Sequence, residues 1–382
     1  MNIPKAEEIV ERGDVDMVVM GRPLLADPEL VNKAAAGRVD LIRPCAGCNA
    51  GCLDAGMKGK PAGCIGNPEC NREYQLMDDK GRMPLEIKTE NPQRILVVGA
   101  GPAGMEFARV ATLRGHKVTI WEKRDRTLGL TKLAATPPRR KDLRYITEWL
   151  DHMCRELGVE IVLNKEATLE SILEVKDQFD RIVLAQGSHA FMPPIPVEEG
   201  AVVNAWDVLE GTAQVGKNVV VVGGGATGVE TAEFIGEIGT LSAEELRFMM
   251  IFEAEPVEKI KELLNHGVKN VSVVEMQPKF ALDINPGCRW SIMKRVRQLG
   301  IELLGETKVV SITKAGVVVQ NADGERILPA DTVVMAAGAK PNTDMYEQLK
   351  EHFEHVDLIG DAVKVAKIPD AISSGYYLGI SF

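Results

Sequence analysis

Long apolar runs and an excess of positive charge are both missing from this sequence of 382 residues. No stretch approaches the roughly 18 apolar residues that cross a bilayer. The opening residues, MNIPKAEEIVERGD, contain no apolar core of the kind found in signal peptides, so we expect a cytoplasmic protein with no membrane partner. The net charge of −10, from 45 basic and 55 acidic residues, argues against nucleic acid as a partner.

Aromatic residues are scarce, and the cysteines do not form an even set. Phe, Trp and Tyr make up 5% of the chain, whereas glycine is abundant, with 36 residues. Of the seven cysteines, five fall between Cys45 and Cys70. An odd and clustered set is not typical of a disulfide framework and favours a reduced chain with one metal or redox site. The length and the 45% hydrophobic content predict a globular α/β protein of two or three domains.

The chain separates into three blocks by local pattern. Residues 1–44 predict a helix, a short strand at 16–20 and a second helix that ends at Gly37. Residues 45–91 are rich in Cys, Gly, Pro and Asn, and a stretch of this kind needs something other than a core to order it. From Arg94 onward, a pattern of strand, glycine turn and helix occurs twice, and residues 308–338 alternate like an antiparallel meander.

The first glycine turn has the spacing of a dinucleotide-binding motif. It contains Gly99, Gly101 and Gly104, follows an apolar strand and opens a helix. In such a turn the first glycine makes the bend, the second lets a pyrophosphate approach the backbone, and the third lets the helix pack on the strand. Glu122 ends the next strand, 18 residues after Gly104, and is placed to accept a hydrogen bond from a ribose hydroxyl.

The second glycine turn contains Gly223, Gly225 and Gly228 in the same setting. Its acidic partner, Glu275, lies 47 residues past Gly228, whereas about 20 is usual. A helical insertion at about 238–268 explains the difference, although an insertion could also bury the site and leave a turn without a ligand. A carboxylate at this strand end favours NADH over NADPH, and the nearby Lys279 keeps that preference weak.

The clustered cysteines have the spacing of a metal site. The pattern Cys45-x2-Cys48-x3-Cys52-x11-Cys64 can wrap one tetrahedral or cubane site, with Cys70 as a competing fourth ligand. The spacing leaves structural Zn²⁺ and a [4Fe–4S] cluster open. If the dinucleotide at the first glycine turn is a flavin, a cluster is favoured, because it can pass single electrons onward and zinc cannot.

From Arg94 to Phe382 the sequence resembles the flavoprotein disulfide reductase-like fold, which binds two dinucleotides. The resemblance rests on the two glycine turns, on strands that end in small-x-Gly turns such as RIVLAQG, and on Gly360-Asp361 before a terminal helix. It implies FAD at the first turn and NAD(P)H at the second. The redox dithiol of that fold is missing, since Cys154 and Cys288 stand alone and are interpreted as small buried hydrophobic residues.

The block GDVDMVVMGRPLLADPELVNKAAAGRVDLIRPCAGCNAGC extends the resemblance over the whole chain. It is similar to the end of the flavin barrel in the NADH:flavin oxidoreductase group, which includes 2,4-dienoyl-CoA reductase, 2-enoate reductase and trimethylamine dehydrogenase. Members combine an FMN-binding (β/α)8 barrel, a [4Fe–4S] segment, and FAD- and pyridine-nucleotide-binding domains. The resemblance implies these roles: Gly21 and Arg22 for the FMN phosphate; Cys45, Cys48, Cys52 and Cys64 for the cluster; Gly99, Gly101, Pro102, Ala103, Gly104, Glu122, Gly129, Gly187, Gly360 and Asp361 for FAD; Gly223, Gly225, Gly228 and Glu275 for NAD(P)H.

The sequence also departs from that pattern. Leu128–Thr131 (LGLT) stands where Gly-Gly-Gln is common, and Gln186 replaces the threonine of an Ala-Thr-Gly turn. The other seven barrel strands, with the substrate-binding and proton-donating residues, have no counterpart, so no catalytic residue is assigned and FMN is expected only if a barrel is supplied. Arg139, Arg140 and Lys141 are interpreted as surface charge.

The predicted architecture is a barrel remnant (1–44), a cluster segment with its linker (45–91), an FAD-binding domain (92–205 and 336–382) and an NAD(P)H-binding domain (206–335). The predicted function is transfer of electrons from NAD(P)H through FAD to a [4Fe–4S] cluster, as the reductase part of an enoate or dienoyl-CoA reductase-like enzyme whose acceptor is unknown. Two alternatives stay open: an electron-transfer subunit that serves a separate chain, and a degenerate nucleotide-binding protein without catalysis.

Overall fold

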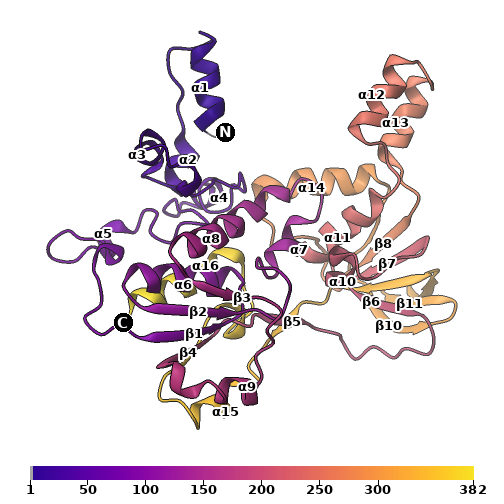
Figure 1. The fold of residues 1–382 in the computed structure, drawn as a ribbon. Coiled ribbons are helices and arrows are strands. Elements are labelled where there is room, and N and C mark those ends of the chain that lie inside the picture. Colours follow the sequence, from indigo (N-terminus) through magenta and orange to yellow (C-terminus); the bar gives the residue numbers. More distant parts are fainter. Residues whose placement is uncertain (1–2) are drawn as a thin grey trace. The chain divides into compact units, whose positions relative to one another are not determined.

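The computed structural model describes residues 3–382, and the chain forms two compact units (Figure 1). The first unit comprises the chain up to Lys132, then Asp142–His189 and Lys340–Phe382. The second unit comprises Leu133–Lys141 and Ala190–Ala339. Where the chain passes between the units, strands β5 (Ser188–Ala190) and β14 (Ala339–Pro341) pair in a two-stranded sheet.

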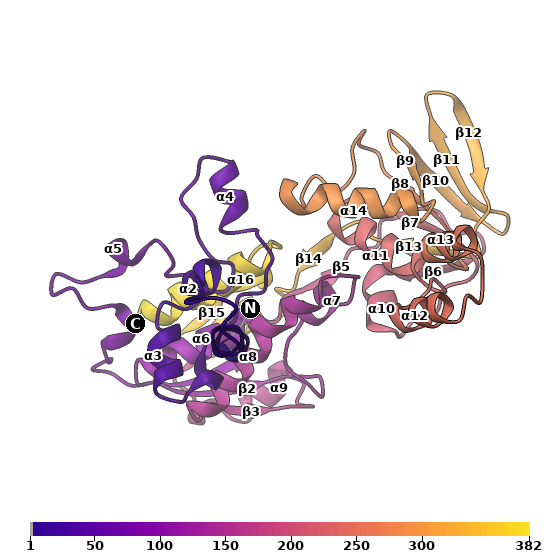
Figure 2. The ribbon, with the colours of Figure 1, turned by 90° about the horizontal axis from the view of Figure 1, so that it is seen from above.

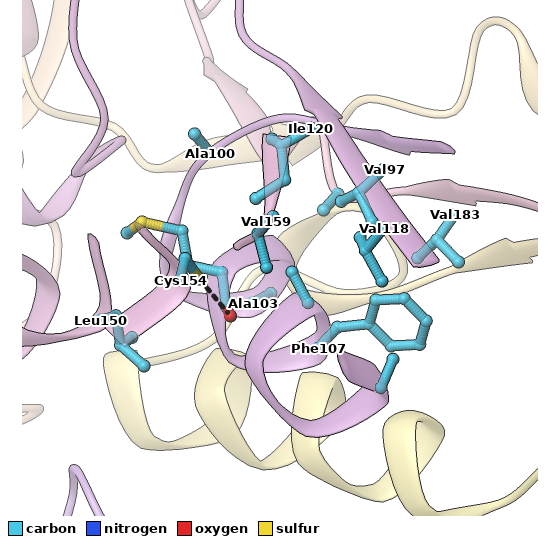
Figure 3. Packing of buried hydrophobic residues seen from close by; sticks show 14 of the residues in the cluster. Val97, Ala100, Ala103, Phe107, Val118, Ile120, Leu150, Cys154, Val159 and Val183 are labelled. Atoms are coloured by element: carbon cyan, nitrogen blue, oxygen red, sulfur yellow. Dashed lines mark hydrogen bonds between the residues drawn. The ribbon is translucent and has the colours of Figure 1, made fainter. Parts of the chain in front are cut away.

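The first unit is built on a five-stranded parallel sheet in the order β15-β4-β1-β2-β3. Its strands are almost wholly apolar, as expected for a parallel sheet that is covered on both faces. Figure 3 shows Phe107 beside the strand residues Val118 and Val183, and Cys154 beside Ala103, all within one buried cluster. The strands are β1 (Arg94–Val98), β2 (Lys117–Trp121), β3 (Glu160–Val162), β4 (Arg181–Leu184) and β15 (Val356–Leu358).

Three helices of the first unit position its glycine turn (residues 99–104) and its cysteine segment (residues 45–91). These are α6 (Pro102–Leu113), α8 (Arg144–Glu156) and α16 (Ile368–Ile380). Helices α6 and α16 approach closely because α16 presents glycine to α6: a side chain at Gly375 would overlap the backbone of Ala103. The shorter elements are α7 (Thr131–Ala135, at the border of the two units), α9 (Leu169–Leu173) and α15 (Tyr346–Lys350).

The second unit repeats this plan with a parallel sheet in the order β6-β13-β7-β8-β9. Strand β6, which the sequence assigned to the first domain, pairs with β13 and therefore belongs to the second sheet. Pairing between strands more than 100 residues apart determines which sheet β6 joins, and the local sequence pattern does not indicate it. The elements are β6 (Ala201–Asn204), α10 (Ala205–Glu210), β7 (Asn218–Val222), α11 (Ala226–Gly236), β8 (Asn270–Val274), α14 (Pro286–Gln298), β9 (Glu302–Leu304) and β13 (Thr332–Met335).

Two further features distinguish the second unit. Helices α12 (Ala243–Ile251) and α13 (Val257–Asn265) lie between α11 and β8 and project as a hairpin (Figure 1). The meander predicted over 308–338 is confirmed for its first three strands, an antiparallel sheet in the order β10-β11-β12 that is seen beside β9 in Figure 2. It is wrong for residues 332–335, which form β13 of the parallel sheet. Its strands are β10 (Lys308–Thr313), β11 (Gly316–Asn321) and β12 (Gly324–Leu328).

The segment that precedes the first sheet is mostly irregular. It contains α1 (Ile3–Glu11), α2 (Gly21–Ala26), α3 (Leu30–Ala35), α4 (Leu53–Met57) and α5 (Glu73–Leu76). The predicted strand at 16–20 is wrong: these residues have no regular structure, and Val19 is 85% exposed. A strand needs a neighbour to take its backbone hydrogen bonds, and none lies beside this stretch among residues 3–382. No helix in the described part of the chain is long and apolar enough to cross a membrane.

Candidate functional site

The glycine turn of the first unit leaves no room for side chains at two positions. Gly99 has φ +108°, and a Cβ there would lie 2.5 Å from the carbonyl oxygen of Ala185. A Cβ at Gly104 would overlap the carbonyl oxygen of Gly99. Gly101 differs, because the nearest atom to a Cβ there, the Cα of Gly129, is 4.0 Å away. The space above Gly101 is therefore open, as the approach of a pyrophosphate requires.

A buried carboxylate supports this turn. Glu122 follows β2, and its Oε2 accepts a hydrogen bond from the backbone N–H of Ala100 at 2.8 Å. Its Oε1 accepts from the N–H of Arg124 at 2.9 Å. The carboxylate therefore lies at the turn itself, which is the position that the sequence predicts for a ribose-binding acid.

The remaining residues assigned to FAD come from separate loops. Three glycines have left-handed backbones: Gly129 (φ +53°), Gly187 (φ +71°) and Gly360 (φ +63°). The Cα of Gly129 is the atom nearest to a Cβ built on Gly101, as described above. A Cβ at Gly360 would lie 2.8 Å from the Cβ of Ala103. The loops before α7 and after β15 therefore meet at the first turn of α6, the helix that also carries Pro102.

Asp361 stands on the last of these loops. Its Oδ2 accepts a hydrogen bond from the hydroxyl of Ser188 at 3.3 Å, and its Oδ1 accepts from the N–H of Ala366 at 3.1 Å. Burial raises the pKa of Asp361.

Two buried polar atoms around this site have no hydrogen-bond partner within residues 3–382: the Oγ1 of Thr131 and the Oε1 of Gln186. Burying such an atom without a partner is costly. Both residues occupy places where the sequence departs from the expected flavoprotein pattern. The open turn and these orphaned atoms fit a bound polar group such as FAD.

The second unit contains the same turn with the same carboxylate arrangement. A Cβ at Gly223 (φ +113°) would lie 2.5 Å from the carbonyl oxygen of Ala336, and one at Gly228 would overlap the carbonyl oxygen of Gly223. The Oε2 of Glu275 accepts from the N–H of Gly224 at 2.6 Å. Glu275 therefore occupies the position that Glu122 has in the first unit, despite its unusual distance along the sequence.

One further residue at this second turn is not apparent from the sequence. The Oδ1 of Asp283 accepts a hydrogen bond from the N–H of Ala226, the first residue of α11, at 2.9 Å. The matching position of α6 is Pro102, which has no N–H. The carboxylate of Asp283 thus lies at the helix N-terminus, where the pyrophosphate of a dinucleotide binds. The only sequence signal was an acidic residue shortly after Glu275.

The structure brings together the four cysteines that the spacing selects. Cys45, Cys48, Cys52 and Cys64 line one cavity, whereas Cys70 does not line it. None of the seven cysteines forms a disulfide. Apolar neighbours close the cavity, including Leu25, Ile65 and Ile146.

The thiols in this cavity are partly shielded from water. Burial raises the pKa of Cys48 to about 11, and it also raises the pKa of Cys64. Within residues 3–382, no three His, Cys, Asp or Glu side chains are arranged to hold a single metal ion. Four thiols around one apolar-walled cavity fit a cluster, which spreads its ligands over several irons.

Arg22 also lines the cysteine cavity, and its guanidinium donates to the Oδ1 of Asn49 at 2.6 Å. Asn49 lies between Cys48 and Cys52. Gly21, the first residue of α2, adjoins this arginine. The pair that the resemblance assigns to an FMN phosphate thus lies at the cysteine segment.

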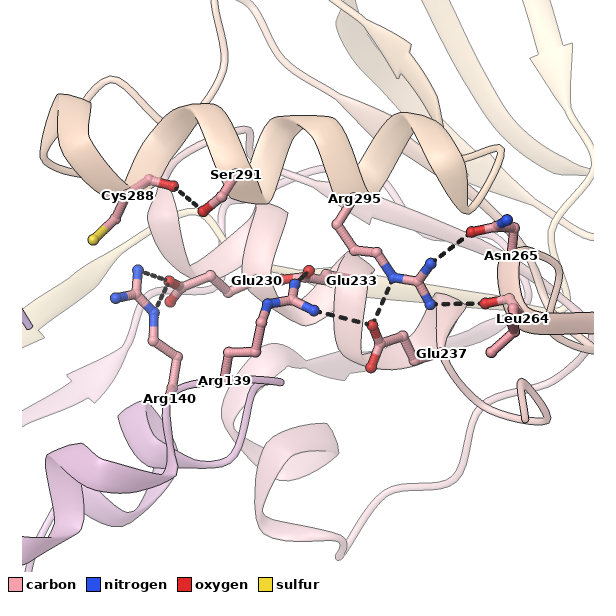
Figure 4. A network of polar contacts seen from close by, with 10 residues as sticks. All are labelled: Arg139, Arg140, Glu230, Glu233, Glu237, Leu264, Asn265, Cys288, Ser291 and Arg295. Atoms are coloured by element: carbon pink, nitrogen blue, oxygen red, sulfur yellow. Dashed lines mark hydrogen bonds and ion pairs between the residues drawn. The ribbon is translucent and has the colours of Figure 1, made fainter. Parts of the chain in front are cut away.

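Arg139, interpreted from the sequence as surface charge, is 53% exposed, whereas Arg140 is only 18% exposed, and both also form ion pairs. Figure 4 shows both arginines paired with α11, Arg139 with Glu233 and Arg140 with Glu230. Glu233 is only 1% exposed, and burial raises its pKa to about 7. The network ties the segment Leu133–Lys141 to α11 within the second unit.

Comparison with known proteins gives three related findings. The family model described as pyridine nucleotide-disulphide oxidoreductase matches residues 53–173 and 171–359. A metal reductase of Desulforamulus reducens is 46% identical over 380 residues, which are 99% of this chain and 56% of that protein. An NADH oxidase of Thermoanaerobacter brockii is 33% identical, over 97% of this chain and 52% of the oxidase.

Among solved structures, 2-naphthoyl-CoA reductase in complex with 2-naphthoyl-CoA superposes with a TM-score of 0.85 at 30% identity. The match covers 100% of this chain and 53% of that one. The chain therefore spans about half the length of the relatives it matches. The predicted α/β class with two nucleotide-binding-type units is confirmed.

Proposed function

The chain belongs to the pyridine nucleotide-disulphide oxidoreductase family, and from this we propose that it delivers electrons from NADH through FAD to a [4Fe–4S] cluster. The observation that carries the proposal is the pair of glycine turns, each in its own α/β unit and each supported by a carboxylate, Glu122 or Glu275. When bound, FAD can accept a hydride and release electrons one at a time, and a [4Fe–4S] cluster can accept them singly.

The first unit would hold FAD. The open backbone at Gly101 and the N-terminus of α6 would receive the pyrophosphate, while Glu122 would accept from the adenine ribose. The flavin half of FAD would lie along the loops that carry Gly129, Gly187, Gly360 and Asp361. The unpartnered oxygens of Gln186 and Thr131 would receive hydrogen bonds that protein groups do not supply.

The second unit would bind the nicotinamide nucleotide. Gly225 leaves the backbone accessible, since the nearest atoms to a Cβ there are the Asp283 carboxylate oxygens at 3.9 Å. A ribose hydroxyl can donate to Glu275, whereas the 2′-phosphate of NADPH would be repelled by its charge. We therefore propose NADH as the preferred donor.

The cysteine segment would carry the cluster on Cys45, Cys48, Cys52 and Cys64. The onward acceptor is proposed from the resemblance to enoate and dienoyl-CoA reductases: an enoate or enoyl-CoA compound, reduced at an FMN barrel that belongs to the same protein or to a partner chain. In that setting Gly21 and Arg22 would contact the FMN phosphate. The name of 2-naphthoyl-CoA reductase supports this class of acceptor.

The proposal is tested by anaerobic purification followed by analysis of flavin, iron and acid-labile sulfide. We expect one FAD per chain, about four irons, and reduction of an artificial dye that depends on NADH. Cys48→Ser should lose iron and keep FAD, because the cysteine cavity and the FAD turn are built from different segments. Cys154→Ala is the matched control, since Cys154 is buried in the core and outside the cysteine cavity. Absence of flavin, or equal iron loss in both variants, would contradict the proposal.

A further inference from the structure

Arg43 is a buried cation beside the cysteine segment. It lies two residues before Cys45, is 8% exposed, and its guanidinium carbon lies 4.6 Å from the centre of the Trp149 ring. Across residues 3–382, no carboxylate lies within ion-pair distance of this guanidinium, and its Nε has no hydrogen-bond partner. Burial lowers the pKa of Arg43, but a guanidinium remains protonated in proteins.

The carboxylates around Arg43 already have other partners. Glu106 forms a buried two-point pair with Arg109, at 2.7 and 2.8 Å. Glu69 accepts from the hydroxyl of Tyr376 at 2.9 Å. The positive charge of Arg43 is therefore not matched by a dedicated anion.

Asp27, a third carboxylate near Arg43, also has another ion-pair partner. It is paired with Lys33 at 2.7 Å, and it accepts the backbone N–H groups of Glu29 at 3.1 Å and of Arg43 at 2.7 Å, but it makes no ion pair with the Arg43 guanidinium. Burying a charge without a counter-charge costs several kcal/mol. A buried cation that is kept in such a place is expected to face an anion supplied by something else.

The cysteine cavity lies close to this unmatched charge. Ile146 lines the cavity. Trp149, whose ring faces the guanidinium of Arg43, lies about one turn further along the same helix, α8. One helical turn advances about 5.4 Å.

We propose that Arg43 is the counter-charge of the cluster held by the four cysteines and raises its reduction potential. The inference rests on the proposed function, because it requires that a cluster occupies the cavity. A cluster with four thiolate ligands is anionic, and it gains one further negative charge when it accepts one electron. A fixed cation nearby stabilises the reduced form more than the oxidised form, so the reduced form is populated at a higher potential. Arg43 is thus a positioning and tuning residue that touches neither substrate nor flavin.

The test is an anaerobic redox titration of the holoprotein followed by electron paramagnetic resonance. Arg43→Gln should lower the ratio of reduced to oxidised cluster about tenfold at a fixed potential, which for one electron is a shift of about 59 mV downward. Arg43→Lys keeps the charge and should stay within about twofold of the wild type. Ile146→Val is the matched packing control, because it changes the cavity wall without changing charge.

A variant of opposite sign separates electrostatics from disruption. Glu69→Gln removes a negative charge from the residue before Cys70, so it should shift the potential upward. If Arg43→Gln yields no folded protein, Arg43→Met takes its place, because this side chain keeps an apolar contact with Trp149: a downward shift of the potential supports the inference, and no shift overturns it. An unchanged potential in Arg43→Gln with full iron content also overturns it. Absence of iron and sulfide in the wild type would instead refute the proposed function, and the analysis of both elements in each sample distinguishes the two failures.

Discussion

Replacing Gly101 and Gly104 by alanine separates the role of the first glycine turn in binding from its role in folding. Gly101 has φ −80° and ψ −179°, a backbone that any residue adopts, and a Cβ there meets only the Cα of Gly129 at 4.0 Å. The cost of Gly101→Ala is therefore that of a poorer helix N-cap, about 0.5–1 kcal/mol. Gly104→Ala would drive its methyl group into the backbone of Gly99 and within 3.1 Å of Val97.

Overpacking of that kind costs about 1–3 kcal/mol, so Gly104→Ala should destabilise the first unit. Gly101→Ala should instead leave the fold intact and weaken FAD binding. A methyl group on the face that receives the pyrophosphate costs about 1–3 kcal/mol, which is roughly a fivefold to 150-fold loss of affinity. The assays are fluorescence titration of the apoprotein with FAD, and urea unfolding followed by circular dichroism.

Gly225→Ala provides the matched experiment in the second unit. A Cβ there has no neighbour closer than 3.9 Å, so this variant should lose NADH affinity and keep FAD affinity. Gly101→Ala should show the reverse. Wild-type FAD affinity in a folded Gly101→Ala protein would refute the reasoning, because the pyrophosphate would then not lie on this turn.

Three further predictions concern charged groups. Glu106→Gln leaves Arg109 buried without its partner and should destabilise the protein by about 3–5 kcal/mol in urea unfolding, whereas the double variant with Arg109→Met should recover most of this loss. The pKa of Glu233 is raised to about 7, above its usual 4.5, so its protonated form stabilises the folded state; this contribution is full below pH 4.5, is lost as the pH rises to about 7, and should vanish in Glu233→Gln. Asp283→Asn removes a negative charge from the N-terminus of α11 and should tighten NADH binding about two- to fivefold in equilibrium titrations.

Each of these has an outcome that contradicts it. A double variant at Glu106 and Arg109 no more stable than the single one would show that the pair does not act as a unit. An unchanged pH profile of unfolding in Glu233→Gln would assign the dependence to another group. Weaker NADH binding in Asp283→Asn would mean that this carboxylate helps to hold the nucleotide and does not compete with it.

The motifs of this protein were readable from sequence because each depends on local chemistry. A turn that requires glycine at Gly99 and Gly104, a carboxylate at the next strand end and four closely spaced cysteines impose fixed spacings that need no knowledge of distant contacts. The meander at 308–328 was also readable, because its strands are neighbours along the chain and its turns carry glycine.

Tertiary structure decided what depends on residues far apart. Only the fold places Glu275 on its turn across the inserted hairpin, sets Asp283 on the N-terminus of α11, and adds β6 to the second sheet. It also left residues 16–20 without strand neighbours in the described part of the chain, although their apolar pattern predicts a strand. The charge of Arg43 is unremarkable in sequence. Its burial against Trp149, with no ion-pair partner among residues 3–382, arises because segments more than 100 residues apart pack together.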